Sequence, residues 1–197
     1  MARKTWKKED GRQKVHFSIQ DPMKKPGGHS KTIYLNNFKN FYEKNKGSDL
    51  DIMLEVKDKN VSAIKCINTL EKDENIKYLE MDWAKYKYSI LEKSHKNYLE
   101  LRKLLKDKNS YPSLEFYNII EESFEIEESP KDYVNSLNHV WGYFKNKATE
   151  KEKNNYFRLI KSYENGLTKG ETVKNFLYKL SVKYDEKYLY KSYYFEL

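Results

Sequence analysis

The sequence predicts an α+β protein in which a short βαβα segment precedes an all-α helical bundle. Residues 13–19 and 51–57 alternate apolar and polar side chains with the period of two that is typical of β-strands, and a helical pattern follows each of them. From about Ile76 onward the hydrophobic period is wholly helical. We therefore expect two domains, residues 1–75 and residues 76–197.

Composition favours a folded protein with a polyanionic partner. Aromatic residues make up 15% of the 197 residues, with 18 Tyr and 9 Phe, whereas disordered chains are normally poor in aromatic residues. The 38 Lys and Arg outnumber the 30 Asp and Glu, which gives a net charge of +8. This excess favours partners such as nucleic acid, although a solvated Lys/Glu surface explains most of the charges.

Cysteine content and hydropathy indicate the compartment. The single cysteine, Cys66, excludes an internal disulfide and a cysteine-based zinc or iron–sulfur site. No apolar run has the length of a membrane span, and residues 1–8 lack the apolar core of a signal peptide. We expect a soluble, cytoplasmic protein with no membrane partner.

The first domain is expected to consist of two strands and two helices in alternation. A loop rich in Pro and Gly, residues 21–30, follows the first strand, and a helix beginning near Leu35 ends at Gly47. After the second strand, Val61, Ile64, Ile67 and Leu70 mark another helix. Such a unit implies parallel strands, and two parallel strands with helices on one side cannot bury both faces of their sheet.

Five helical segments with short connections are expected in the second domain. The first is traced as one long helix through Leu79 to Leu105 that ends near Lys108-Asn109, and the second is opened by Pro112. Ser129 and Pro130 form a cap and a first-turn proline for the segment 133–144. A capping box of Thr149 and Glu152 starts a helix that ends at residues 165–166, and the last segment covers residues 172–184.

Ionisable residues inside the two strands suggest a metal site at the strand ends. Lys14 and His16 share one strand face, and Glu55 shares a face with Met53 and Lys57. A carboxylate or imidazole in an otherwise apolar strand must be paired or ligated to offset its desolvation. The alternative is that both strands are edge strands with solvated faces, and the pattern alone leaves both interpretations open.

Four stretches of the first domain resemble the C-terminal end of the UV damage endonucleases. They are Thr5-Trp6, residues 11–18 (GRQKVHFS), residues 28–30 (GHS) and residues 51–57 (DIMLEVK), and their order and spacing agree over roughly residues 5–70. The resemblance implies that the two strands are the last two strands of a TIM barrel. The first six strands, with most of the metal ligands, are absent from this sequence.

The resemblance also implies chemistry for particular residues. That family cuts DNA 5′ to UV photoproducts with divalent metals, commonly Mn²⁺. His16 and Glu55 match metal ligands, and Lys14 matches a lysine that is carboxylated so that it can bridge metals, which makes all three catalytic candidates. His29 matches a loop histidine that contacts either phosphate or the loop itself, and Lys57 is a weaker DNA-binding candidate.

The second half of the chain resembles the YbgA-like or DUF1722 domain over about residues 83–197. The resemblance rests on Trp83, Lys87-Tyr88, Tyr98, Arg102, the run 138–145 (NHVWGYFK), Tyr163, Gly166 and Tyr188-Leu189. This family is helical, has no settled activity and occurs attached to other enzymes. In the helix 133–144, we expect Trp141, Tyr143 and Phe144 to lie in the core.

Together the two resemblances predict the C-terminal portion of a UV damage endonuclease fused to a YbgA-like domain. Its partner would be UV-damaged DNA, and it would be inactive without the N-terminal barrel, which a separately encoded fragment could supply. The alternative is a non-enzymatic module whose helical domain binds nucleic acid or a partner protein.

Overall fold

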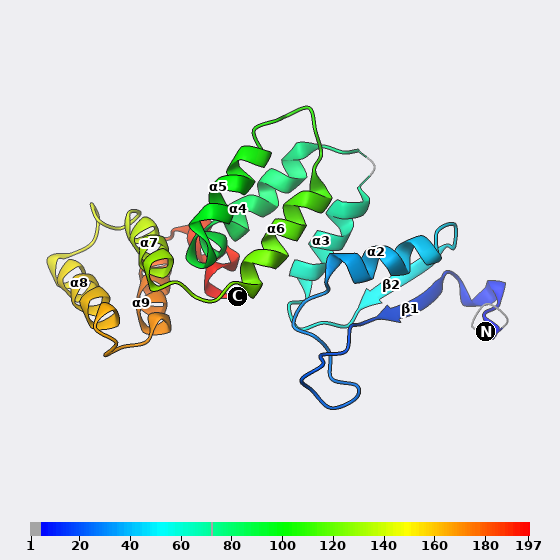
Figure 1. Cartoon of the computed structure of the whole chain (residues 1–197), viewed down its shortest axis with the longest axis horizontal. Coiled ribbons are helices and arrows are strands. Elements are labelled where there is room, and N and C mark those ends of the chain that lie inside the picture. Colours follow the sequence, from blue (N-terminus) through cyan, green and yellow to red (C-terminus); the bar gives the residue numbers. More distant parts are fainter. Residues whose placement is uncertain (1–4, 72) are drawn as a thin grey trace. The chain divides into compact units, whose positions relative to one another are not determined.

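Two units make up the chain in the computed structural model, Met1–Asp73 and Glu74–Leu197 (Figure 1). The structure describes residues 5–71 and 73–197. The first unit combines helices with a small sheet, and in the described residues of the second unit all regular secondary structure is helical. This mixture agrees with the predicted α+β class.

A parallel strand pair forms the centre of the first unit. After a 3₁₀ turn, η1 (Lys8–Asp10), the order is β1 (Gln13–Phe17), α2 (Leu35–Lys44), β2 (Leu50–Leu54) and α3 (Asn60–Leu70). The strands pair directly, from Gln13 opposite Leu50 to Phe17 opposite Leu54. The prediction of adjacent parallel strands is confirmed.

Both strands are shorter than the predicted ranges 13–19 and 51–57, and β1 ends where the chain changes its pairing partner. The Glu55 amide donates to the Phe17 carbonyl at 2.9 Å, just past the end of the ladder. The Ile19 carbonyl then accepts from the Ser30 amide at 2.8 Å, so residue 19 pairs with the returning loop instead of with β2.

Helices cover one face of the strand pair. Ile33, Phe38 and Cys66 form the buried core of the unit, and Phe17, Ile52 and Leu54 are among the partly buried side chains that pack against it. Figure 1 shows α2 running alongside both strands. The opposite face carries Lys14, His16 and Met53, and 58% of Met53 is exposed.

The helices of the second unit are α4 (Ile76–Lys93), α5 (His95–Leu104), α6 (Ser113–Glu125), α7 (Pro130–Trp141), α8 (Glu150–Glu164), α9 (Gly170–Lys183) and α10 (Lys187–Tyr190), followed by the 3₁₀ turn η2 (Tyr193–Phe195). The prediction of one helix over residues 79–105 is wrong. Ser94 is extended, with φ −158° and ψ 110°, and its hydroxyl accepts from the Asn97 amide at 3.2 Å. Ser94 therefore ends α4 and caps α5.

The other predicted helix signals agree with the structure. Pro130 is the first residue of α7, and the Ser129 hydroxyl caps that helix. The Thr149 and Glu152 side chains form the capping box of α8. Gly166 follows this helix with a φ of 69°, a left-handed conformation that glycine adopts without a steric penalty.

Tyrosines supply much of the core of the second unit. Asp82 is 3% exposed and accepts hydrogen bonds from Tyr117 at 2.8 Å and from Tyr193 at 3.2 Å. These bonds join α4 to α6 and to η2, and they satisfy a carboxylate that would be costly to bury alone.

The core interpretation of the 138–145 run is correct for two of its three aromatic residues. Trp141 and Phe144 are buried, and Trp141 stacks on Tyr156 with ring centroids 4.3 Å apart. Tyr143 is only half-buried, and its hydroxyl contacts that of Tyr88 at 2.9 Å.

Gly170 lets the Tyr133 ring pack against the start of α9. A β-carbon at residue 170 would lie 2.4 Å from the ring carbon Cζ and 2.6 Å from the hydroxyl of Tyr133, whose side chain is buried. We predict that Gly170→Ala lowers the free energy of unfolding by about 1–3 kcal/mol, because the ring has to shift in a packed core. Urea denaturation followed by circular dichroism measures this loss.

Thr172→Ala is the matched control for Gly170→Ala, because Thr172 is exposed in the same turn of α9. Its expected effect is within about 0.5 kcal/mol. Equal stability of the two variants would show that the Tyr133 packing tolerates a side chain at residue 170.

Candidate functional site

The face of the sheet away from the helices is polar. Lys14 lies opposite Asp51 and His16 lies opposite Met53, and all four side chains are exposed. Arg12 adds a charge at the start of this face, since its guanidinium lies 3.3 Å from the Asp51 carboxylate. The hydrogen bond to Asp51, followed by the charge of Asp49, raises the pKa of Arg12 above its ordinary value.

Glu55 lies between two imidazoles at the carboxyl end of this face. Its backbone amide continues the ladder from β2, and its side-chain oxygen Oε1 is in hydrogen-bond contact with Nδ1 of His16. Its second oxygen, Oε2, lies 3.6 Å from Nε2 of His29. The structure therefore brings His16, Glu55 and His29 together, although they come from β1, from the end of β2 and from a loop.

A closed loop holds His29 in this position. The Asp21 amide donates to the Gly28 carbonyl at 2.8 Å across the base of the loop. Inside it, the Gln20 side-chain amide donates to the carbonyls of Asp21 at 2.7 Å and Lys25 at 3.1 Å, and its oxygen accepts from the Gly27 amide at 2.8 Å. The loop is therefore built around the side chain of Gln20.

Lys14 and Lys57 lie beside this group without joining it. Lys14 is exposed on the same face as His16 and makes no side-chain hydrogen bond or ion pair with any residue that the structure describes. Lys57 is exposed two residues past Glu55 and likewise makes no such contact within the described ranges.

The donors present are a partial set for a metal ion. Imidazole and carboxylate suit Mn²⁺-type ions. However, across residues 5–71 and 73–197 no group of three or more His, Cys, Asp and Glu side chains is arranged to hold a metal. His16 and Glu55 supply only part of a coordination shell, so a complete metal site at this position requires further ligands.

A buried polar network fixes the chain that follows His29, and the sequence did not reveal it. The Ser62 hydroxyl donates to Asp58 at 2.9 Å and accepts from the Ile33 amide at 2.8 Å. Lys65 is 2% exposed and donates to the Thr32 hydroxyl at 3.1 Å. The sequence feature that could have indicated this network is the spacing of Ser62 and Lys65, two polar residues one turn apart on α3.

The apolar stripe that was predicted for α3 is only partly buried. Ile67 is 61% exposed, whereas Lys65 and Cys66 are buried. Ile67 lines an apolar hollow of about 450 Å³ in the first unit, together with Leu70 of α3 and Ile52, Leu54 and Val56 of the β2 segment.

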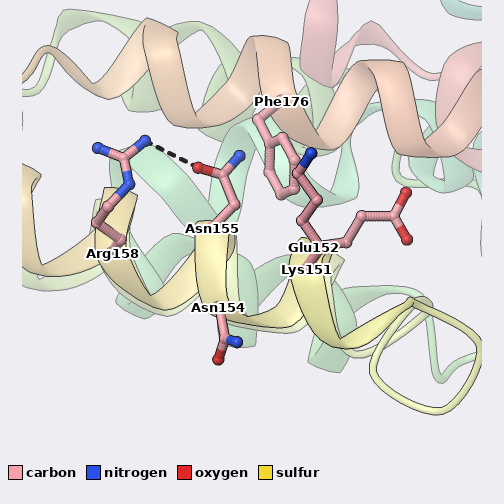
Figure 2. A pocket seen from close by; sticks show the side chains of 6 residues that line it. All are labelled: Lys151, Glu152, Asn154, Asn155, Arg158 and Phe176. Atoms are coloured by element: carbon pink, nitrogen blue, oxygen red, sulfur yellow. Dashed lines mark hydrogen bonds between the residues drawn. The ribbon is translucent and has the colours of Figure 1, made fainter.

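A second hollow, of about 470 Å³, lies between α8 and α9. Figure 2 shows Lys151 and Asn155 rising from α8 toward the ring of Phe176, while Arg158 donates to Asn155 at 2.8 Å. The Glu152 carboxylate also belongs to its lining. Its charged lining is thus two cations, Lys151 and Arg158, and one carboxylate that already pairs with Lys183.

One protein family matches the helical part of the chain. It is described as a protein of unknown function (DUF1722), and its match covers residues 87–197, which is more than half of the sequence. The chain belongs to the DUF1722 family. Membership accounts for the second unit and assigns it no activity.

Two relatives of this DUF1722 protein carry names from DNA repair. The UV DNA damage endonuclease of Clostridium perfringens is 39% identical over 170 residues, which cover 82% of this chain and 39% of that protein. A protein of Acanthamoeba polyphaga mimivirus, provisionally named a UV-damage endonuclease, is 42% identical over 66 residues, which cover 31% of this chain and 19% of the viral protein.

The first match is longer than either unit, so it includes residues of both. The chain spans about two fifths of the length of the Clostridium relative and about a fifth of the viral one. No solved structure is significantly similar to it. Within the described residues, no helix combines the length and apolarity that crossing a membrane requires.

Gln20→Ala tests how His29 is held. We predict that the loop opens locally, because the variant loses the side-chain bonds at the centre of the loop. Amide hydrogen exchange at Gly27 and Gly28 should accelerate about tenfold or more, since one lost bond of about 1–1.5 kcal/mol corresponds to that factor. Lys25→Ala, which removes an exposed side chain from the same loop, is the control and should leave exchange unchanged. Similar exchange in both variants would contradict the assigned role of Gln20.

The lowered pKa of Glu152 makes the stability of the DUF1722 unit depend on pH. Hydrogen bonds from Lys183, and then from the Thr149 amide and the Tyr184 hydroxyl, lower the pKa of Glu152 from 4.5 to about 2. Because the folded pKa is depressed, the stabilisation is complete above pH 4.5 and is lost as the pH falls toward 2. We predict that Glu152→Gln flattens the dependence of unfolding free energy on pH in this window.

Glu150→Gln is the control for the pH test, since Glu150 lies in the same first turn and its side chain is 81% exposed. It should retain the pH dependence of the original chain. A flattened profile in both variants would assign the effect to the helix terminus as a whole instead of to Glu152.

Proposed function

We propose that this chain is the C-terminal portion of a UV damage endonuclease that hydrolyses a phosphodiester bond 5′ to UV photoproducts in DNA. The observation that carries the proposal is the placement of Glu55 between His16 and His29 at the carboxyl ends of two parallel strands. Ligands of parallel α/β folds bind at this end of the strands. The name of the Clostridium relative supports the choice of substrate.

The proposed context of the sheet is a TIM barrel, with β1-α2-β2-α3 as its last two strand–helix pairs. In such a barrel the inner face of each strand lines the barrel and helices cover the outer face. The observed pair has helices and the core on one face and Lys14, His16 and Asp51 on the other. The apolar hollow beside β2 and α3 would be filled by a neighbouring strand–helix pair.

The proposed metal is a divalent ion, Mn²⁺ in preference, with His16 and Glu55 as ligands and Lys14 as a bridging ligand once it is carboxylated. When bound, the metal supplies an activated hydroxide and offsets negative charge on the phosphate. Contact with Glu55 orients the His16 ring. Carboxylation is needed at Lys14, because an ammonium would repel the metal.

DNA contacts are proposed for His29 and Lys57. His29 lies at the rim of this group, within reach of the Glu55 carboxylate, and Lys57 is exposed just past the strand. Both positions suit contacts with a phosphate backbone, which position the substrate without specifying a base sequence.

The chain alone is expected to be inactive, because two ligands and one modified lysine cannot fix the several metals of such a site. We predict that UV-irradiated DNA with Mn²⁺ is not nicked by the 197-residue chain. Nicking 5′ to a photoproduct should appear when the chain is mixed with a fragment of the Clostridium relative that contains the residues outside the match. Gel analysis of an end-labelled duplex with one photoproduct measures this cleavage.

Two variants make this complementation test specific. Glu55→Gln should lower nicking about 10- to 100-fold, because it removes a ligand and the partner of His16. Glu43→Gln, which changes an exposed carboxylate on α2, should leave nicking unchanged. Robust nicking by the chain alone, or complementation that survives Glu55→Gln, would show that the chemistry lies on other residues.

A further inference from the structure

Four nitrogen-bearing side chains of the DUF1722 unit lie near one another. Lys87 is close enough to Arg102, and His139 is close enough to Lys87 and His95, for their charges to interact. Lys87 extends from α4, His95 and Arg102 from α5, and His139 from α7. Lys87 is half-buried, whereas the other three are exposed. We call these four residues the cationic cluster.

Tyrosine rings surround the cationic cluster. The Arg102 guanidinium lies over the Tyr98 ring at 5.6 Å, and the His95 ring stacks against Tyr98 with centroids 6.2 Å apart. The Lys87 ammonium donates to the Tyr88 hydroxyl at 3.3 Å and lies over the Tyr88 ring.

Tyr143 and Tyr188 extend this aromatic surface. The Tyr143 hydroxyl contacts that of Tyr88 at 2.9 Å, and the Tyr143 ring stacks on Tyr188 at 6.1 Å with an interplanar angle of 19°. Tyr188 is 39% exposed, so its ring is accessible from solvent. Much of the family resemblance of the second unit therefore rests on residues that meet here.

The charge of the cationic cluster is not neutralised within the described part of the chain. No described carboxylate forms an ion pair with Lys87, Arg102, His95 or His139. Asp132 is the nearby acid, and it accepts a hydrogen bond from the backbone amide of His95 at 3.1 Å.

The mutual repulsion is visible in two pKa values. Burial, and then the charge of Arg102, lower the pKa of Lys87. Burial, and then the charges of Lys87 and His95, lower the pKa of His139. A bound anion would offset the charge contribution to both shifts, although not the contribution of burial, and perturbed groups of this kind concentrate at functional sites.

Some other lysines of the unit have acidic partners. Lys174 pairs with Glu92 at 3.2 Å, and Lys183 pairs with Glu152 at 2.7 Å. The cationic cluster is thus distinguished from these pairs by its unopposed charge. Like charges held side by side cost free energy unless a ligand compensates them.

We propose that Lys87, Arg102 and His139 bind a backbone phosphate of single-stranded nucleic acid while Tyr188 stacks against a base. Cationic side chains beside exposed aromatic rings are the general means of binding single strands without sequence preference. The choice of a nucleic acid as the ligand rests on the proposed function, whereas the anion site rests on the geometry of the cluster.

The test is fluorescence anisotropy of a labelled 15-nucleotide oligothymidine with the full chain, without metal and without UV irradiation. We expect binding that weakens with salt, as phosphate contacts require. Arg102→Gln and His139→Asn should each raise Kd by about 5- to 20-fold, and Tyr188→Ala should do the same through lost stacking. The absence of binding would overturn the proposal even if the complemented endonuclease were active.

Lys103→Gln is the matched control for Arg102→Gln, since it removes the same charge from an adjacent exposed position of α5. It should change Kd by less than about twofold, and thermal unfolding should show that all variants remain folded. Equal weakening in Lys103→Gln would overturn the proposal in favour of diffuse attraction. Tyrosine fluorescence changes with inorganic phosphate, without any oligonucleotide binding, would overturn it in favour of a small phosphorylated ligand.

Discussion

The register of the parallel strand pair is the constraint on which the candidate site depends. With Gln13 opposite Leu50, the side chains of Ile52 and Leu54 face the helices, and Asp51 and Met53 face the polar side with His16. A slip by one residue would exchange the two faces of β2. Burying each large aliphatic side chain stabilises the fold by about 1.5–3 kcal/mol, so the core holds the register that brings Glu55 to His16.

The polar face of the sheet could be predicted from the sequence, because strand alternation is a local property. The predictions were wrong where contacts with distant residues determine the structure. The end of β1 depends on a loop amide, that of Ser30, which no periodicity encodes. The helical spacing of apolar residues continues from Ile90 to Tyr98, and this continuity predicts one helix. Ser94, a residue type that favours N-cap positions, interrupts it. On α3, the buried Lys65 ammonium donates a hydrogen bond to the Thr32 hydroxyl. A hydrophobic pattern cannot predict such a partner from another part of the chain.

The cationic cluster illustrates a deeper limit of sequence reasoning. The sequence places Lys87, Arg102 and His139 far apart along the chain, and the structure places them on three different helices. A pattern that is followed along one helix at a time does not bring these residues together. Their neighbours lie on other helices. The charge of Arg102 on α5 helps to lower the pKa of Lys87 on α4, and the charge of Lys87 helps to lower the pKa of His139 on α7. Such convergence follows from how the helices pack, which depends on buried contacts such as those of Asp82.

The two units differ in the size of their cores and in whether their own residues form the whole candidate site. The DUF1722 unit encloses large side chains that are wholly buried, among them Tyr117, Tyr156 and Tyr194, and its cationic cluster is formed entirely by its own helices. The sheet unit has a small core, an apolar hollow beside β2 and a partial set of metal ligands. The hollow lies on the apolar side of β2 and the candidate ligands lie on the opposite face. Under the proposed barrel, further strand–helix pairs would cover the first and supply ligands beside the second. If both proposals hold, binding to nucleic acid and cleavage of it are separable in this chain, since the first resides in the DUF1722 unit and the second requires further barrel strands.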